Sequence, residues 1–410
     1  MAPTSSPPPR LVDVAEQRPL ADPPHKGEGK TAASSFALFR DDLAGREVLF
    51  ERPSEIIAPT IADDFETAFA HIQAAHDAGK WLAGYFSYEA GYLLEPKLAP
   101  LLPPRRRVPL FCLGVFDRPS EHGLAAAPAP TNGPIFDARA GWSFQEYEKR
   151  FDRLHGHIRK GDCYQGNLTF PVDAQWSGDP LAAFNALTAR QPVKYGALIS
   201  LGGPTILSRS PELFFKIDAQ GWIETHPMKG TAPRGATPAE DRRLKTFLRN
   251  DEKNQAENRM IVDLLRNDIS LISEVGTLDV PELFRIETYP TVHQMVSTVR
   301  ANLLPGLSIR QIFAALFPCG SITGAPKIRA MEILRELEDT ARGVYCGAIG
   351  WIAPNGTMRF SVAIRTISLF ADGEAVYNVG GGVVFDSSAR EEYDECLLKT
   401  RFAMTTPAST

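Results

Sequence analysis

The chain has 410 residues, of which 43% are hydrophobic and 23% charged, and its formal net charge at pH 7 is −5. This is the composition of an ordinary globular protein, and it provides no basic surface of the kind that binds nucleic acid or anionic membranes. No apolar run approaches the roughly 18 residues of a membrane span, and residues 1–9 lack the apolar core of a secretory signal.

The first 140 residues predict a tail followed by a region of short strands. Residues 1–30 are rich in proline and charge, which predicts a disordered N-terminal tail. Residues 31–140 contain short apolar runs around a helical stretch at 61–78, where Phe65, Phe69 and Ile72 fall on one stripe. The end of this region, from 118 onward, is rich in alanine, proline and glycine and is typical of a surface connection.

Residues 141–405 mix helices and strands without a βαβ rhythm. Periodicity predicts helices over 144–160, from Glu257 to about 265, and from Pro326 onward. Apolar runs predict strands at 195–201, 205–217, 347–353 and 358–369, and a Pro-Asn-Gly turn joins the last two as a hairpin. Alternation along the last strand puts Arg365 on its polar face. The mixture favours an α+β fold with large antiparallel sheets over a doubly wound parallel sheet.

The five cysteines, Cys112, Cys163, Cys319, Cys346 and Cys396, are an odd number and include no C-x-x-C pair. This argues against a disulfide framework and against a zinc site. We therefore expect a reducing, cytoplasmic environment with buried, inert thiols.

A rigid turn at 225–235 surrounds Lys229. Pro227 restricts the backbone before the lysine, and Gly230 after it allows a close approach by backbone or ligand. Such a turn presents one amine, so Lys229 is a candidate nucleophile or fixed charge. A solvated turn lysine would show the same pattern.

Two glycine-rich segments predict contact with a small anionic substrate. In residues 320–327, small side chains lead into a helix whose first residue is expected to be Pro326, and Lys327 adds positive charge to this anion cradle. In the second segment, Gly380, Gly381 and Gly382 permit close backbone approach after a strand. Arg365 could add a bidentate fork for a carboxylate. Tight turns and a surface arginine are the alternatives.

Carboxylates gather on two predicted helices. Glu392, Glu395 and Lys399 share one helix face, and Glu257 opens another helix. Mg²⁺ is usually held by one or two carboxylates together with substrate oxygens and water. The spacing therefore admits a Mg²⁺ site, although acidic helix faces are often merely solvated.

In chain order, these segments resemble the chorismate-utilising enzymes, a family that includes anthranilate synthase, aminodeoxychorismate synthase, isochorismate synthase and salicylate synthase. The resemblance is dense over 141–403 and loose before it. It is carried by residues 210–212, 227–231, 256–268, 293–297, 320–327, 345–351, 363–366, 380–382 and 392–395.

Two positions indicate the branch of the family. Lys229 lies in a Pro-Met-Lys-Gly-Thr motif, where aminodeoxychorismate synthases carry lysine and anthranilate synthases carry alanine. Gln165 stands where isochorismate and salicylate synthases carry a water-activating lysine. The chain is thus similar to component I of the aminodeoxychorismate synthases. An anthranilate-forming enzyme like anthranilate synthase component I is the alternative, and a non-catalytic chorismate-binding scaffold is a third possibility.

The resemblance implies two large antiparallel sheets packed face to face with helices outside, where residues 31–140 complete the β-sandwich and 141–405 carry the chorismate site. It implies that Glu257, Glu392 and Glu395 hold Mg²⁺. Lys229 would attack chorismate, and Glu212 is the candidate acid because unaided expulsion of hydroxide is difficult. The implied substrate-binding residues are Arg365, Gly380, Gly381, Gly382, Tyr345, Ser321, His293, Lys399 and Gln165.

The implied product is 4-amino-4-deoxychorismate, the precursor of 4-aminobenzoate in folate biosynthesis. The sequence contains no Cys-His-Glu glutaminase module, so ammonia is expected from a glutaminase subunit of the component II type or from free ammonium. Three places depart from the common family pattern: Gly166 stands where valine is usual, Arg259 stands where leucine is usual, and the stretch after Asp268 reads Ile-Ser rather than Leu-Gly.

Overall fold

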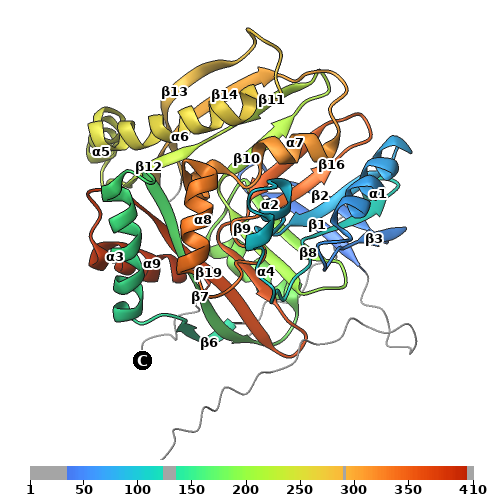
Figure 1. Ribbon diagram of the computed structural model, residues 1–410, viewed down its shortest axis with the longest axis horizontal. Coiled ribbons are helices and arrows are strands. Elements are labelled where there is room, and N and C mark those ends of the chain that lie inside the picture. Colours follow the sequence, from blue (N-terminus) through green and yellow to red (C-terminus); the bar gives the residue numbers. More distant parts are fainter. Residues whose placement is uncertain (1–34, 123–134, 290–291, 404–410) are drawn as a thin grey trace, which may run out of the picture. The chain divides into compact units, whose positions relative to one another are not determined.

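The computed structural model describes residues 35–122, 135–289 and 292–403, so the predicted tail at 1–30 lies outside the described residues. Within these ranges, no helix has both the length and the apolar character needed to cross a membrane. All paired strands of the two sheets run antiparallel, as the α+β prediction requires (Figure 1).

The first sheet, sheet A, has nine strands in the order β15-β7-β19-β18-β9-β8-β1-β2, with β6 also paired to β7. Its strands are β1 (Phe36–Asp41), β2 (Arg46–Glu51), β6 (Ile135–Ala140), β7 (Gln165–Trp176), β8 (Tyr195–Ser200), β9 (Thr205–Ser210), β15 (Gly324–Ala325), β18 (Thr366–Leu369) and β19 (Glu374–Val383).

The second sheet, sheet B, has ten strands in the order β12-β14-β11-β10-β17-β16-β4-β5-β3, with β13 also paired to β14. Its strands are β3 (Glu55–Ile57), β4 (Trp81–Phe86), β5 (Phe111–Phe116), β10 (Leu213–Ile217), β11 (Trp222–Thr225), β12 (Met228–Pro233), β13 (Asp279–Thr288), β14 (Val292–Asn302), β16 (Ala348–Ile352) and β17 (Met358–Val362).

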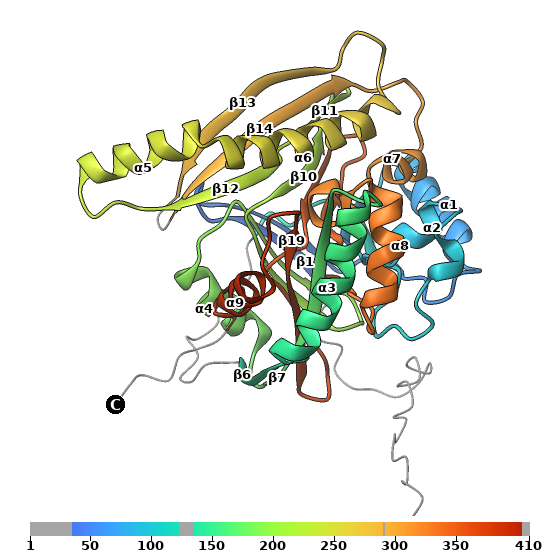
Figure 2. The ribbon, with the colours of Figure 1, turned by 60° about the vertical axis from the view of Figure 1, so that its left-hand side comes forward.

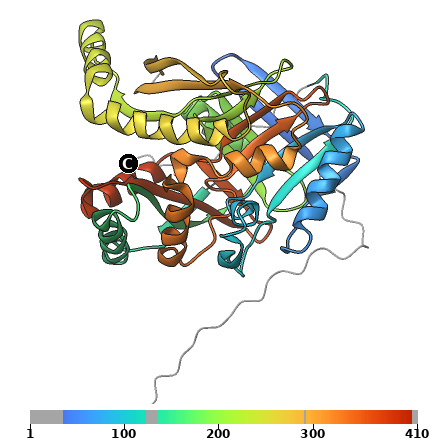
Figure 3. The same cartoon turned by 45° about the horizontal axis from the view of Figure 1, so that its top comes forward.

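Helices cover the outer faces of the sheets. Figure 2 shows α6 along β13 and β14, and shows α3, α8 and α9 beside β7 and β19. In Figure 3 the yellow helices α5 and α6 lie on one side, and the green α3 and red α9 on the other. The helices are α1 (Phe65–Asp77), α2 (Ala90–Leu94), α3 (Phe144–Lys160), α4 (Pro180–Arg190), α5 (Pro238–Asn250), α6 (Glu252–Ser270), α7 (Ile309–Leu316), α8 (Lys327–Leu337) and α9 (Ala389–Thr400), with 3₁₀ turns η1 (Ala99–Leu101) and η2 (Gly320–Ile322).

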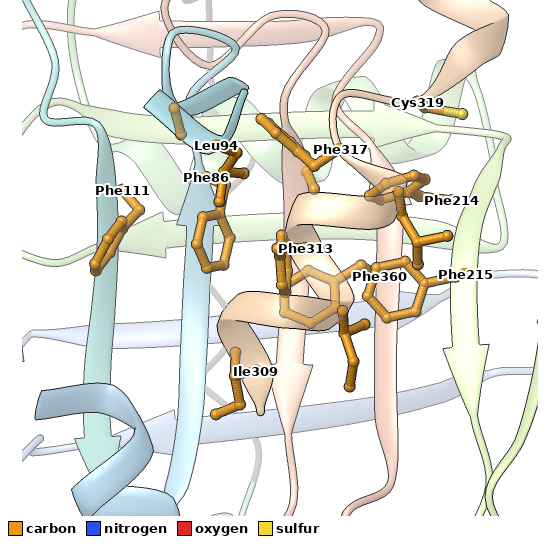
Figure 4. Close-up of a cluster of buried hydrophobic side chains, with 14 of the residues drawn as sticks. Phe86, Leu94, Phe111, Phe214, Phe215, Ile309, Phe313, Phe317, Cys319 and Phe360 are labelled. Carbon is orange, nitrogen blue, oxygen red and sulfur yellow. The ribbon is translucent and has the colours of Figure 1, made fainter. Parts of the chain in front are cut away.

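Three apolar layers hold these parts together. Between the sheets, inward side chains such as Ile199 of sheet A and Ile349 of sheet B form one core. A second core lies between sheet A and the helices α3, α4, α8 and α9. A third core lies between sheet B and its helices, where Phe313 of α7 stacks on Phe86 with ring centroids 4.0 Å apart (Figure 4). Burial of apolar area in these layers is the main favourable term in folding.

The ends of α3 show why the predicted helix forms where it does. Ser143 forms a capping box with Glu146, which satisfies backbone donors at the N-terminus. Gly161, with φ of 80°, ends the helix in the left-handed conformation that glycine adopts without strain. The helix therefore spans 144–160 as predicted.

Two predicted strands are in fact pairs of strands that belong to different sheets. Residues 205–217 divide into β9 of sheet A and β10 of sheet B, and residues 358–369 divide into β17 of sheet B and β18 of sheet A. The second break is at Arg365, whose φ of +51° cannot continue a strand. Arg365 thus lies in a link between two sheets, and its placement on the polar face of one strand was wrong.

Three smaller predictions also need correction. The helix expected to open at Glu257 begins at Glu252, because Asp251 caps it through the backbone N–H of Asn254. Pro326 is the N-cap residue of α8 rather than its first helical residue. The glycines 380–382 do not follow a strand; they lie within β19, paired to β7.

Two of the departures from the family pattern, Gly166 and Arg259, have structural explanations. Gly166 lies against α3, and a Cβ added there would be 2.8 Å from Leu154 Cδ1, so glycine allows this helix to pack closely. Arg259 is exposed on α6, and its guanidinium lies 5.6 Å from the ring centroid of Phe284 on β13. It therefore contributes a cation–π contact at a position where an apolar side chain would be exposed.

Candidate active site

The two links between the sheets lie next to each other. The link from β9 to β10 carries Glu212, and the link from β17 to β18 carries Arg365. Backbone hydrogen bonds connect them on both sides: Val362 N donates to Glu212 O at 3.1 Å, and Arg209 N donates to Arg365 O at 3.0 Å. The two links are therefore held side by side through their backbones where the chain changes sheets.

Glu212 is a buried acid with a perturbed pKa. Its side chain is 6% exposed and accepts a hydrogen bond of 2.8 Å from Ser321 Oγ on η2. Burial raises the pKa of Glu212 to about 7, although the Ser321 hydrogen bond and the charge of Lys229 act in the opposite direction. A carboxyl group with this pKa is protonated in half of the molecules at neutral pH, which suits a general acid.

Lys229, on β12, and Gln165, at the start of β7, converge on Gly382. A Cβ added to Gly382 would lie 3.1 Å from Gln165 Nε2 and 3.2 Å from Lys229 Nζ. Gln165 is fully buried, and both its Nε2 and its Oε1 have no hydrogen-bond partner in the described part of the chain. Because buried amides are nearly always bonded, this side chain is suited to a ligand held between Lys229 and the glycine strand.

Residues of α9 lie beside the same glycine strand. The carboxylate of Glu392 is so close to Gly381 that an added Cβ would lie 2.6 Å from its Oε2. Lys399 Nζ binds Glu395 Oε1 and Gly380 O, each at 2.8 Å, and so fastens α9 to β19. Burial, with the nearby charge of Glu395, raises the pKa of Glu392. For Glu395 burial acts in the same direction, but the ammonium groups of Lys399 and Lys229 outweigh it and lower its pKa.

Arg365 is a partly buried cation without an acidic partner in the described part of the chain. Its guanidinium forms no ion pair with any residue that the structure describes, and burial lowers its pKa. Keeping a charge out of water without a counter-ion is unfavourable. This arrangement is therefore suited to an anion supplied by a ligand, held by the planar fork of the guanidinium.

Three other predicted site residues are Tyr345, Glu257 and His293. Tyr345 is buried beside Cys346, and burial raises its pKa, with the thiol of Cys396 on α9 also contributing. Glu257 is partly exposed on α6. His293 is fully buried on β14, where its ring nitrogens contact Asp241 Oδ1 and Thr288 Oγ1, both at 3.0 Å. Its ring is therefore engaged with α5 and β13 rather than with Ser321 or Glu212.

Lys327 does not add charge to an anion cradle as expected. Its ammonium pairs with the buried Asp268 of α6 at 2.6 Å and donates to Leu316 O at 3.0 Å. The charge of Lys327 is thus used to join α8 to α6.

Two polar contacts to site residues had no sign in the sequence patterns. Cys319 Sγ lies 3.3 Å from Ser321 Oγ, and Ser387 Oγ donates to Glu392 Oε1 at 2.7 Å.

The donors present are compatible with a magnesium ion in their chemistry. Glu392 and Glu395 are oxygen ligands on one helix face, the ligand type that Mg²⁺ prefers. Among the described residues, however, no three acidic, histidine or cysteine side chains gather closely enough to bind a metal by themselves. A Mg²⁺ site here would need oxygens from substrate or water in addition to these carboxylates.

A cavity of about 140 Å³ lies elsewhere, between the sheets near β1 and β8. Its walls include Phe39, Arg46, Tyr195, Trp351 and Arg359. None of the predicted site residues lines it, so cavity volume does not identify the candidate active site in this chain. The convergence of Lys229, Gln165 and Glu212 identifies it better.

Comparison with known families decides the classification. Residues 35–405 match the chorismate binding enzyme family. The chain belongs to this family. The match includes both sheets and every predicted site residue, so the links that carry Glu212 and Arg365 lie inside the family's fold.

Individual relatives are similar over most of this chain. Aminodeoxychorismate synthase component 1 of Klebsiella aerogenes is 42% identical over 301 residues, which are 72% of this chain and 65% of that protein. An anthranilate synthase component 1 of Haloarcula marismortui is 42% identical over 274 residues, 67% of this chain and 55% of the relative. The chain thus spans less than two-thirds of the length of these curated relatives.

Solved structures show the same fold. Anthranilate synthase component I from Streptococcus pneumoniae TIGR4 superposes with a TM-score of 0.75 at 25% identity, covering 97% of this chain and 100% of the other. The menaquinone-specific isochorismate synthase from Escherichia coli gives a TM-score of 0.70 at 16% identity, covering 91% and 89%. The predicted face-to-face antiparallel sheets with outer helices are therefore confirmed as the fold of chorismate-utilising enzymes.

Proposed function

We propose that this chain aminates chorismate at C4 to give 4-amino-4-deoxychorismate, the precursor of 4-aminobenzoate. The observation that carries the proposal is the pairing of Lys229 with Gln165 at Gly382, facing Glu212. A lysine in this position offers a nucleophile, and an uncharged amide beside it does not activate water. Relatives named aminodeoxychorismate synthase component 1 support the same assignment.

In the proposed reaction, the amine of Lys229 forms a bond to C2 of chorismate while the C4–O bond breaks. Glu212 donates its proton to the departing hydroxyl, which leaves as water, and Glu212 becomes a carboxylate. Ammonia then forms the C4–N bond, and the bond between Lys229 and C2 breaks. The protonated amine of the product returns a proton to Glu212, which restores both side chains. Dividing one difficult substitution into two steps is the benefit of a covalent intermediate.

Substrate carboxylates would be held by groups that surround this centre. Arg365 offers a partly buried guanidinium without a counter-ion among the described residues, and the backbone of residues 380–382 admits close approach because it has no Cβ. Lys399 and Tyr345 would complete the binding surface near α9. These residues orient the substrate so that C2 faces Lys229.

We further propose that Glu257, Glu392 and Glu395 bind Mg²⁺ together with substrate oxygens. The bound ion would neutralise a substrate carboxylate and anchor it. Glu395→Gln removes one charged ligand and is expected to weaken metal binding at least tenfold, whereas Glu391→Gln on the exposed start of the same helix leaves it unchanged. Calorimetric titration with Mg²⁺ in the presence of chorismate tests this, and equal affinities in both variants would contradict it.

Ammonia would come from a glutaminase subunit, in line with the component naming of the relatives. The single chain is therefore expected to use ammonium and not glutamine. An alternative function, supported by anthranilate synthase relatives, is formation of anthranilate. Incubation with chorismate, Mg²⁺ and ammonium separates the two: an aminated product that keeps its enolpyruvyl group supports the proposal, and anthranilate fluorescence supports the alternative.

A further inference from the structure

One edge of β7 lacks a strand in the stretch next to the candidate active site. Along its other edge β7 pairs with β19 from Gly166 to Gln175. On the edge in question, β15 covers Gln165 and Gly166, and β6 covers the region from Val172 to Trp176. The backbone between these two neighbours must find hydrogen bonds elsewhere.

A buried ion pair supplies bonds at this gap. Arg342 Nη2 donates to Asn167 O at 2.8 Å, and Glu338 Oε1 accepts from Thr169 N at 3.0 Å and from Thr169 Oγ1 at 3.0 Å. The pair is closed by two bonds, Nε to Oε2 at 2.8 Å and Nη2 to Oε1 at 2.7 Å. One donor and one acceptor thus meet β7 much as a neighbouring strand would.

The same guanidinium also reaches the segment that carries Ser321. Arg342 Nη1 donates to Ile322 O at 3.2 Å. Asn167 adds two bonds between the same segments, from its backbone N to Thr323 O and from Nδ2 to Ile322 O. Arg342 therefore joins the strand that begins with Gln165 to the turn that holds Ser321 against Glu212.

The surroundings of Arg342 hold it in one position. The residue is 4% exposed, and its guanidinium lies 4.3 Å from the ring centroid of Tyr88. Its backbone N–H donates to Glu89 Oε1 at 2.7 Å, which anchors the main chain as well. Removing one partner of a buried pair leaves the other uncompensated, so such pairs are sensitive to substitution.

We infer that Arg342, held by Glu338, is a positioning residue that takes the place of a missing strand on β7 and thereby fixes Gln165 and Ser321 at the reaction centre. The catalytic part of this inference rests on the proposed function. The effect is on placement rather than on binding charge, because in the described part of the chain Arg342 forms no hydrogen bond or ion pair with Arg365, Lys399 or the α9 carboxylates. A displacement of about 1 Å at a reaction centre can cost on the order of a hundredfold in rate.

The test compares Arg342→Lys with Arg150→Lys in the full chain. Lysine keeps the charge of Arg342, but three donors on one nitrogen cannot reproduce the four bonds that three guanidinium nitrogens make to Glu338, Asn167 O and Ile322 O. Arg150 is a matched control, because it binds the same end of α8 through Leu337 O at 3.0 Å and through Asp339, and within the described residues it forms no hydrogen bond or ion pair with β7. We expect Arg342→Lys to lower kcat about 10- to 100-fold, with KM for chorismate changed less than about threefold, and Arg150→Lys to leave both near wild type.

Amide hydrogen exchange provides a readout that does not depend on activity. In Arg342→Lys, exchange of the Asn167 and Thr169 amides should accelerate about tenfold or more, because their segment loses buried hydrogen bonds, and the control should leave it unchanged. Unchanged exchange, or a kcat loss no larger than the loss of folded protein, would overturn the inference. A wild-type chain that fails to aminate chorismate would refute the proposed function, while the exchange experiment would still decide the positioning role.

Discussion

The two links between the sheets share a backbone design and differ in chemistry. Each passes from one sheet to the other, and each accepts a backbone hydrogen bond from beside the other link. Glu212 is buried with a hydroxyl partner, and burial raises its pKa to about 7. Arg365 is a partly buried cation that has no acidic partner within the described residues. We therefore propose that one link supplies a proton and the other a site for an anion.

This difference shows how one structural device can support two functions. A link between sheets places its side chain between two rigid scaffolds, where neither water nor loop motion easily compensates for its charge. The identity of the residue then decides the outcome: an acid is neutralised by burial, whereas a guanidinium keeps its charge and attracts a ligand. Substitutions at the two links should accordingly affect different kinetic constants.

The largest effect is expected at the acidic link. Glu212→Gln keeps the shape of the side chain and its bond to Ser321 but removes the transferable proton. We expect kcat for amination to fall about 10²- to 10⁴-fold, with KM for chorismate nearly unchanged. Steady-state kinetics with ammonium checks this, and a variant that keeps more than half of the wild-type kcat would exclude Glu212 as the acid.

The same substitution should make the folded protein more stable at alkaline pH. Because the pKa of Glu212 is raised from 4.5 to about 7 in the folded state, its contribution to stability is complete below about pH 4.5 and is lost as pH rises through 7. A neutral glutamine does not suffer this loss, which amounts to about 3 kcal/mol as an upper value. Thermal unfolding at pH 5 and pH 8.5 should show that the advantage of Glu212→Gln appears only at the higher pH.

A smaller effect, on binding, is expected at the basic link. Arg365→Met removes the charge and should raise KM for chorismate about 10- to 100-fold, the value of one or two charge-assisted hydrogen bonds, while kcat changes less. Arg359→Met is the matched control, since Arg359 lies on β17 just before the link and lines the separate cavity. A similar rise of KM in both variants would show that Arg365 has no special role.

The smallest effect is expected at Ser321. The rate of amination should fall on the alkaline side with an apparent pKa near 7, because Glu212 must be protonated to act as an acid. The groups that face its carboxyl are Ser321, Lys229 and the thiol of Cys319. Ser321→Ala removes a hydrogen bond that favours the carboxylate form of Glu212. The alkaline limb of the pH–rate profile should therefore move to higher pH by roughly half a unit to one unit, with a few-fold change in kcat. An alkaline limb that stays at the same pH or moves to lower pH would contradict this account of Glu212.

Much of the fold could be predicted from local patterns. The α3 helix, the hairpin at 354–356 and the antiparallel α+β class follow from periodicity, capping and turn residues that act over a few positions. The strand break at Glu212 also had a local signal, because Pro211 cannot donate a ladder hydrogen bond within residues 205–217. The break at Arg365 had none, since a positive φ at an arginine depends on tertiary packing.

The candidate site was predictable only where the sequence resembles a family. Motifs identified Lys229, Glu212 and Gln165, whose side chains the structure brings together. The Arg342–Glu338 pair was missed, because an i,i+4 pair on a sequence is indistinguishable from a solvated surface pair until the missing strand edge is known. His293 was expected at the substrate ring, but its bonds to Asp241 and Thr288 depend on how α5 packs. The roles of all these residues stay predictions.

The covalent role of Lys229 is the central claim, and mass spectrometry of the intact protein tests it most directly. The chain is incubated with chorismate and Mg²⁺, with ammonium limiting, and quenched during turnover. Our account predicts a substrate-derived mass increment in the wild type, mapped to Lys229 by peptide digestion, and its absence in Lys229→Ala. An increment that persists in Lys229→Ala, or amination by that variant at the wild-type rate, would show that Lys229 is only a binding charge.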